Sequence, residues 1–375
     1  MRYGFFALAA AELALLLTLP APANPDHPGV IGGLRTAASQ LRGEGPRTDL
    51  VQDYGGARRL AGTGDLYPPL GESYREVGID FHPPHRSTHP PTAFVLVLPV
   101  AGFSWQAASA VWGALMLAAI GAAWWALGVP VALAAALAPL TLLWPPAAWS
   151  LGQLTPLWLL GLTLAWKWQR RAGVAGAAVA LASLTKLLPA LSLIPLTVER
   201  RWRALLGFGA VWAAALAALL ALRPGALERY LDVIRSTGRG QAARHENAAL
   251  LWAFAHNLGV GGVVAGIMLL AAVLVTALAI GGEWAWWAWC WAGVALLPIA
   301  WIYSLLPLLP VMVFCVRRGG LLSRGLVGVP LVVPLLIDPF GLPGAIRLAT
   351  ATACLGVSLL AVAYAPLLGR VRFST

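Results

Sequence analysis

Residues 203–222, RALLGFGAVWAAALAALLAL, decide the fold class, because about 20 apolar residues are what a helix needs to cross a bilayer. Residues 260–281, VGGVVAGIMLLAAVLVTALAIG, form a second such run without a charged side chain. Both runs are continuous and rich in Leu and Ala. An outer-membrane barrel would instead show strands of about ten residues in which polar and apolar residues alternate. The sequence therefore predicts membrane-spanning helices.

The composition extends this prediction to the whole chain. Of its 375 residues, only 11% are Asp, Glu, Lys or Arg, against about 25% in a soluble globular domain. The hydrophobic share of 59% also excludes a disordered protein. The net charge of +11 comes from 24 Arg and two Lys, a skew that reflects codon composition rather than nucleic-acid binding. Cys290, Cys315 and Cys354 lie in apolar runs and lack the spacing of a metal site.

Ten further apolar runs raise the expected number of spans to about twelve. Most are shorter than 20 residues, which suits helices that are re-entrant or buried among others. They cover residues 5–19, 106–127, 130–146, 155–168, 172–186, 187–198, 285–302, 304–316, 321–337 and 344–366. The pair between Arg171 and Glu199 is expected to form a hairpin of two short helices that breaks near Pro189.

The first of these runs has two interpretations. Ala21-Pro22-Ala23 has the A-x-A form of a signal-peptide cleavage site, so residues 1–23 could be removed. Glu12 within the run is unusual for a signal peptide, and the rest of the chain is itself membranous. We therefore expect a retained first span.

The distribution of basic residues predicts the orientation. With a cytoplasmic N-terminus, the inner segments hold twelve basic residues and one acid, Glu199, if the turn at Glu283 is left aside. The outer segment at 24–90 is mixed, with seven Arg and eight acids. An even number of spans then places both termini inside. The inner basic residues are Arg2, Lys167, Arg170, Arg171, Arg200, Arg201, Arg203, Arg317, Arg318, Arg324, Arg370 and Arg372.

Two long polar segments, residues 24–91 and 223–248, are predicted to lie on the outer face of a single integral-membrane domain at 1–375. Loops of this length are usually functional or disordered. The first segment holds Tyr54 and Tyr67 and most of the acidic residues, so it is not a simple linker. Residues 90–101 are apolar but too short to span, which indicates a re-entrant or interfacial helix.

The first outer segment contains the densest cluster of reactive residue types. Asp49 and Asp53 are four residues apart, so a helix would place both carboxylates on one face. Such a pair suits a general base or a metal site. Arg58 and Arg59 follow about one turn later and suit a phosphate. A solvated amphipathic helix with internal ion pairs explains the same pattern, and the residues alone favour it.

Three histidines, His82, His85 and His89, lie within eight residues of one another. Three histidines this close together are compatible with a metal site. However, the proline pairs around them force extended backbone, and His82 and His85 do not have helical spacing. A rigid loop that carries polar groups to the membrane surface is the favoured interpretation, without a bound metal.

Several short motifs follow one another over residues 45–318. The first outer segment has an early Asp, then Tyr, Ala-Arg, Leu-Tyr and a His-Pro-Pro that enters an apolar helix. The later motifs are Gly152-Gln153-Leu154-Thr155-Pro156, Lys186-Leu187-Leu188-Pro189, Glu246-Asn247-Ala248-Ala249-Leu250 and Pro298-Ile299-Ala300-Trp301-Ile302-Tyr303. Taken together, these motifs resemble glycosyltransferase family 87 of the GT-C fold, whose members depend on polyprenol-phosphate-mannose. The chain departs from the family pattern at Ala249 (usually Ser), His256 (usually Arg) and Asp53 (often Tyr).

The resemblance implies a GT-C bundle of about 12 transmembrane helices and an inverting transfer of a hexose, with mannose favoured. The donor would be a polyprenyl-phosphate sugar and the acceptor a hydroxyl of a lipid or glycan. By position Asp49 matches the family's general base, and Asp53 is the second choice or an orienting partner. No cofactor is implied, and the outer carboxylates do not demand a divalent metal. The remaining substrate-binding candidates are Tyr54, Arg58, His89, Gln153, Lys186, Arg244, Asn247, His256, Trp301 and Tyr303.

Each of these candidates also has a structural interpretation. Lys186 could snorkel to the headgroups, although a Lys inside an apolar run indicates a functional site by default. Gln153, Asn247, His256 and Tyr303 could equally make hydrogen bonds between helices. The five tryptophans of residues 284–291 are interpreted as an interfacial belt.

Two other functions compete with the transferase. A transporter or lipid-linked-sugar flippase would need ionisable residues at mid-membrane, where only Glu12 is a candidate. A non-catalytic assembly subunit is the third hypothesis. The favoured prediction is a multi-pass enzyme of the plasma (inner) membrane that acts in the cell envelope, with its active site on the non-cytoplasmic face and no nucleic-acid partner.

Overall fold

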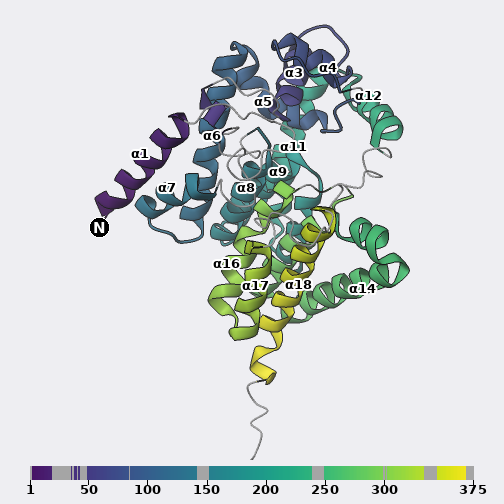
Figure 1. The fold of residues 1–375 in the computed structure, drawn as a ribbon. Coiled ribbons are helices and arrows are strands. Elements are labelled where there is room, and N and C mark those ends of the chain that lie inside the picture. Colours follow the sequence, from purple (N-terminus) through teal and green to yellow (C-terminus); the bar gives the residue numbers. More distant parts are fainter. Residues whose placement is uncertain are drawn as a thin grey trace, which may run out of the picture.

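The computed structural model describes residues 2–18, 35, 38–39, 41–42, 49–83, 85–141, 152–238, 249–298, 300, 302–332 and 344–368. Within these residues the regular elements are sixteen α-helices and three short 3-10 or π segments, with no β-strand. An isolated bridge between Pro69 and Arg86 is the one β-type pairing in this part of the chain. The predicted all-α class is therefore confirmed (Figure 1).

Three of the described helices are long and apolar enough to cross a bilayer by themselves: α6 (Trp105–Ala126), α11 (Arg203–Leu222) and α14 (Leu250–Ile280). The expected number of about twelve spans is not confirmed. The remaining predicted spans fall on α1 (Arg2–Thr18), α7 (Val131–Leu140), α8 (Thr155–Lys167), α9 (Ala172–Thr185), α10 (Leu193–Val198), α15 (Gly282–Ala295), α16 (Leu309–Arg318), α17 (Leu321–Val332) and α18 (Gly344–Leu368).

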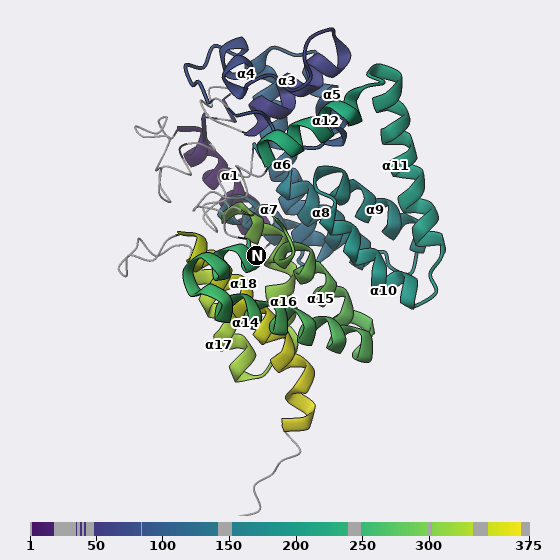
Figure 2. The ribbon, with the colours of Figure 1, turned by 90° about the vertical axis from the view of Figure 1, so that its right-hand side faces the viewer.

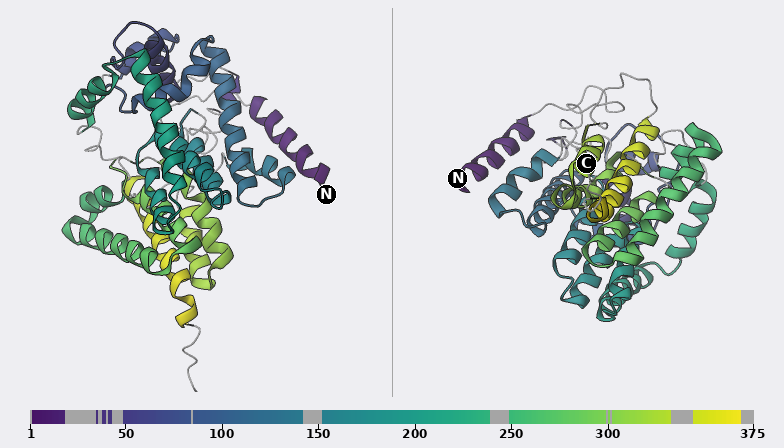
Figure 3. Two further views of the ribbon diagram at one scale, coloured as in Figure 1. Left: turned by 180° about the vertical axis from the view of Figure 1, so that it is seen from behind. Right: turned by 90° about the horizontal axis from the view of Figure 1, so that it is seen from below.

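Helix α14 begins at Leu250 rather than at the predicted residue 260. Gly259 adopts a φ of 63° inside it, and this left-handed conformation, which suits glycine, kinks the helix. The helical segment that follows this kink coincides with the predicted run at 260–281, and residues 250–258 form a separate short segment before it. Figure 3 shows α14 on one side of the molecule and α1, which packs against α7, at another edge.

The predicted short hairpin is present. Helix α9 ends at Thr185, and a 3-10 turn at Leu188–Ser192 leads into α10. The break precedes Pro189, because proline has no backbone N–H and its ring prevents continuation of the preceding helix. Figure 2 shows α9 and α10 beside α11, whose far end leads back toward α12 (Ala226–Val233).

The polar helices α3 (Asp49–Ala61), α4 (Leu70–Glu76) and α12 gather at one end of the molecule, with α5 (Pro91–Ala101) below them (Figure 1). The two long polar segments therefore touch. Arg229 on α12 forms a two-pronged ion pair with Asp65, at 3.0 and 2.7 Å. Arg223 donates to the backbone carbonyls of Gly62 and Gly64. Which side of a membrane this end faces stays a prediction.

The tryptophans of α15 lie in the core, and the prediction of an interfacial belt is wrong. Trp286, Trp287 and Trp291 are at most 1% exposed, and Trp284 and Trp289 at most 9%. The indole N–H groups of Trp284 and Trp291 donate to backbone carbonyls of α18, each at 2.8 Å. Helix α15 is covered by α14, α16 and α18, so its aromatic side chains fill space between helices instead of meeting lipid headgroups.

Candidate active site

Helix α3 brings Asp49 and Asp53 to one face, as their spacing predicts. The helix packs closely on α5 at Gly56 and on α4 at Gly55, because these glycines have no side chain at either contact. A Cβ on Gly56 would lie 2.6 Å from the ring of Phe94, and one on Gly55 would lie 3.1 Å from the hydroxyl of Ser73. Any larger residue at position 56 would therefore push α3 away from α5.

Asp53 and His89 form the central contact of the site. The Asp53 Oδ1 lies 2.8 Å from the His89 Nδ1, and Asp53 is 0% exposed. The second carboxylate oxygen of Asp53 is also buried and has no hydrogen-bond partner in the described part of the chain. The backbone of His89 is fixed on both sides, because its N–H donates to Ser87 Oγ and its carbonyl accepts from the Tyr67 hydroxyl.

Lys186 joins this pair from a distant part of the sequence. The hydroxyl of Thr92, at the start of α5, donates to the carbonyl of Leu184 at 2.8 Å. This bond fixes the end of α9 against the residue run that carries His89. Lys186 follows directly and lies close enough to interact electrostatically with both Asp49 and His89. The cluster therefore contains two acids and two bases.

The charges of this cluster depend on one another. Burial raises the pKa of Asp49, although the charge of His89 and, more weakly, that of Lys186 oppose the shift. Burial lowers the pKa of His89, but the charge and hydrogen bond of Asp53 and the charge of Asp49 outweigh it, so the net pKa is raised. His89 is therefore held as an imidazolium further into the neutral range than a free histidine.

A second layer of ion pairs holds the helices that carry the cluster. Arg59 donates to Ser73 at 2.9 Å and to Glu76 at 2.5 Å, which ties α3 to α4. Asp65 accepts from Arg86 at 2.9 Å as well as from Arg229. The Tyr67 ring lies between Phe94 and Tyr230, with centroids 5.3 and 5.9 Å away. These contacts involve both polar segments.

The other predicted site residues do not gather around the cluster of Asp49, Asp53, His89 and Lys186. Tyr54 is buried, and its hydroxyl donates to the carbonyl of Phe103. Arg58 is exposed, 5.6 Å above the Tyr54 ring. Gln153 is buried just before α8, and the exposed His256 stacks near Trp252, with no described contact between either of them and the cluster. Arg244, Asn247 and Trp301 lie outside the described residues, as does the side chain of Tyr303.

Sequence reasoning did not identify Thr92, Asp65 or Arg229 as important. Thr92 gives no sequence signal, since its role depends on a carbonyl 92 residues away. For Asp65 and Arg229 a signal exists, because two polar segments expected on one face can exchange opposite charges. The sequence does not indicate which acid pairs with which arginine, so this ion pair could not be predicted from it.

The histidine loop gives little support to a metal site. Within the described residues, no group of three or more His, Cys, Asp or Glu side chains is arranged to hold a metal ion. His82 lies 3.2 Å from Asp80, and His89 is engaged with Asp53. The imidazoles of His82 and His89 therefore contact different carboxylates.

Comparison with known proteins identifies a family. The model described as glycosyltransferase family 87 matches residues 88–313, which is more than half of the chain and includes His89, Thr92 and Lys186. The match begins after α3, so Asp49 and Asp53 lie outside it. Neither the curated proteins nor the solved structures that were searched give a match.

Proposed function

Because the chain belongs to glycosyltransferase family 87, we propose that it transfers a hexose, with mannose favoured, from a polyprenyl-phosphate donor to a hydroxyl of a lipid or glycan. The transfer takes place on the non-cytoplasmic face of the plasma membrane. The observation that carries this proposal is the meeting of Asp49, Asp53, His89 and Lys186 at the end of the molecule where the polar helices gather. Membership of a transferase family favours this function over a transporter or a flippase.

Asp49 is the better candidate for the general base. Its side chain keeps partial exposure, and burial raises its pKa, which makes the ionised carboxylate more basic. Asp53 is fully buried and hydrogen-bonded to His89, so it acts as a positioning residue. These different surroundings give the two carboxylates different roles.

The proposed step is a single displacement at the anomeric carbon. The Asp49 carboxylate takes the proton of the acceptor hydroxyl while the hydroxyl oxygen attacks that carbon. The bond from the carbon to the phosphate oxygen breaks, the configuration inverts, and polyprenyl phosphate leaves with the electron pair. Lys186 and the protonated His89 supply the positive charge that stabilises the leaving phosphate.

Transfer in reconstituted membranes tests the proposal. Asp49→Asn keeps the shape of the side chain and removes its basicity, so transfer from a polyprenyl-phosphate-mannose donor should fall about 100-fold or more. Asp80→Asn is the matched control, because Asp80 is 96% exposed and touches only the loop histidine His82 within the described structure. Wild-type activity in Asp49→Asn, or an equal loss in both variants, would contradict the assignment.

A further inference from the structure

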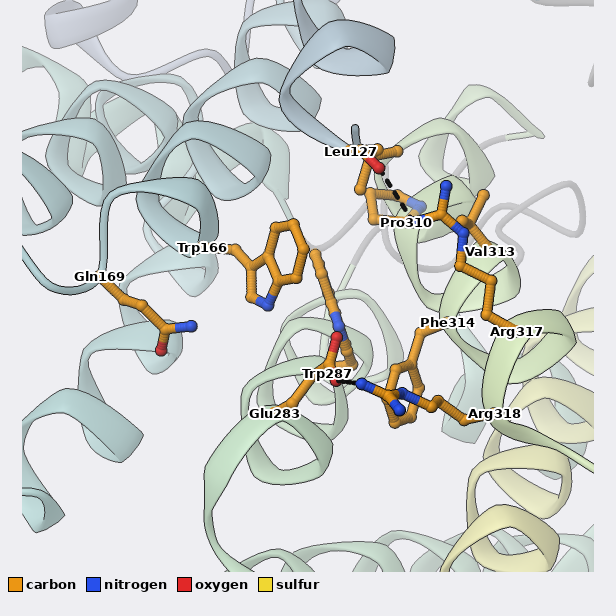
Figure 4. Close-up of a pocket in the computed structure, with 10 residues that line it drawn as sticks. All are labelled: Leu127, Trp166, Gln169, Glu283, Trp287, Pro310, Val313, Phe314, Arg317 and Arg318. Carbon is orange, nitrogen blue, oxygen red and sulfur yellow. Dashed lines mark hydrogen bonds and ion pairs between the residues drawn. The ribbon is translucent and has the colours of Figure 1, made fainter. Parts of the chain in front are cut away.

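A cavity of about 430 Å³ lies at the other end of helix α9 from the candidate active site. Helix α9 fixes this relation, since it starts beside the cavity at the turn after α8 and ends beside the active site at Lys186. The cavity lies between the last turns of α8 and α16 and the first turn of α15 (Figure 4). Its lining consists of Leu127, Trp166, Gln169, Glu283, Trp287, Pro310, Val313, Phe314, Arg317 and Arg318.

Two indole N–H groups in this lining lack an acceptor. The rings of Trp166 and Trp287 lie 5.5 Å apart, and Trp287 is only 1% exposed. The Nε1 atoms of both are buried and have no hydrogen-bond partner in the part of the chain that the structure describes. A buried donor without a partner is unfavourable, because the loss of its hydration is not compensated. An acceptor that enters the cavity would remove this cost.

The charges at the cavity favour an anion. Arg318 is paired with Glu283 at 3.0 Å, so the charges of these two groups cancel. Arg317 donates to the uncharged carbonyl of Leu127 at 2.9 Å, which leaves its positive charge at the edge of the cavity. Arg201 lies nearby, where its guanidinium donates to the carbonyl of Gln169, but its charge is balanced by Glu199 at 2.7 Å, so Arg317 is the cation without an acidic partner among these residues.

The rest of the lining is apolar and suits a hydrocarbon chain. Leu127, Pro310, Val313 and Phe314 contribute aliphatic or aromatic surface, and Figure 4 shows them among the residues that line the cavity. A soluble anion would gain nothing from these side chains, whereas an amphiphile would use both parts of the cavity. Basic pockets between transmembrane helices on the cytoplasmic side are a known form of lipid headgroup site.

We propose that this cavity binds the phosphate headgroup of an anionic phospholipid from the adjacent leaflet. The indole N–H groups of Trp166 and Trp287 donate to phosphate oxygens, Arg317 supplies the counter-charge, and the apolar wall receives the start of an acyl chain. The site is separate from the transfer chemistry, so it stands whether or not the proposed function is correct.

Photolabelling of the full-length protein tests this proposal. The protein is placed in phosphatidylcholine nanodiscs that contain a photoactivatable phosphatidic acid, and the labelled peptides are identified by mass spectrometry. Trp287→Phe removes the N–H and keeps an aromatic ring, and Arg317→Gln removes the charge. Because a hydrogen bond to a charged group is among the stronger ones, labelling of peptides around Trp166 and Trp287 should fall about tenfold in each variant.

Two control variants match these changes. Trp286→Phe alters a neighbouring buried indole that also lacks a partner in the described structure but does not line the cavity. Arg203→Gln removes an exposed charge from the basic turn before α11. Labelling should stay unchanged in both controls and should resist competition by inorganic phosphate.

Three outcomes would overturn the proposal. Equal losses in the test and control variants would show that surface charge alone recruits the lipid. Displacement of the label by inorganic phosphate would assign the cavity to a soluble anion. Unchanged labelling in Trp287→Phe would show that the indole N–H does not bind the headgroup. If Arg317→Gln fails to fold, the result for Trp287→Phe alone tests the proposal.

Discussion

Asp49 and Asp53 lie one helical turn apart, yet their carboxylates meet different surroundings. Asp53 is enclosed and bound to His89 at 2.8 Å, while Asp49 retains contact with solvent and feels the charges of His89 and Lys186. The spacing of four predicts that the two acids share a face. It cannot predict which of them is buried, because burial depends on how α4, α5 and α11 pack around the helix.

The pKa shifts predict how transfer depends on pH. Because the pKa of Asp49 is raised, transfer should begin to fall on the acidic side at a higher pH than an ordinary Asp would give. The charge of His89 lowers the pKa of Asp49, so His89→Gln should raise that pKa further and move the acidic limb to still higher pH. The measurement is the transfer rate against pH at saturating donor.

His82→Gln is the control for this shift, since His82 lies in the same loop, is 55% exposed at its side chain and pairs with Asp80. Its pH profile should match that of the wild type. Superimposable pH profiles for His89→Gln and the wild type would show that the imidazole does not influence the pKa of Asp49.

At the scale of elements, the contact between α3 and α5 depends on Gly56. In Gly56→Ala the new Cβ would lie 2.6 Å from the Phe94 ring, so α3 and α5 must separate and Asp53 moves relative to His89. Overpacking of this kind costs about 1–3 kcal/mol. We expect a lower thermal unfolding temperature in detergent and a reduced transfer rate.

Gly64→Ala is the matched control for this change. Gly64 is exposed, and a Cβ there would meet nothing closer than 3.9 Å. If Gly56→Ala unfolds at the same temperature and transfers sugar as fast as Gly64→Ala, the close approach of the two helices does not determine the site.

Local sequence patterns predict these elements well only where one physical signal dominates. The apolar run at 203–222 coincides with α11, and the proline at 189 marks the break between the two helices of the short hairpin. Helix α15 shows the limit, because its tryptophans have the composition of an interfacial belt but lie buried between α14, α16 and α18. Hydropathy indicates whether a side chain can lie in an apolar environment. The packing of neighbouring helices determines whether that environment is lipid or protein.

At the scale of the whole molecule, charge is divided between two ends. The end with α3 and α12 carries acidic and basic residues that pair with one another, such as Asp65 with Arg229. The other end carries the basic turns after α8 and α10, where five arginines accompany one acid, Glu199, which pairs with Arg201. From this asymmetry we predict that the candidate active site and the proposed lipid cavity face opposite sides of the membrane.

Accessibility to a membrane-impermeant maleimide checks this arrangement directly. A single cysteine introduced as Glu72→Cys lies on exposed α4, and one introduced as Arg171→Cys lies in the exposed basic turn before α9. In intact cells, with the three native cysteines replaced by serine, Glu72→Cys should react and Arg171→Cys should react only after permeabilisation, because unpaired basic turns stay on the cytoplasmic side. The reverse pattern would place the carboxylate cluster in the cytosol, where it could not receive a donor presented on the outer leaflet.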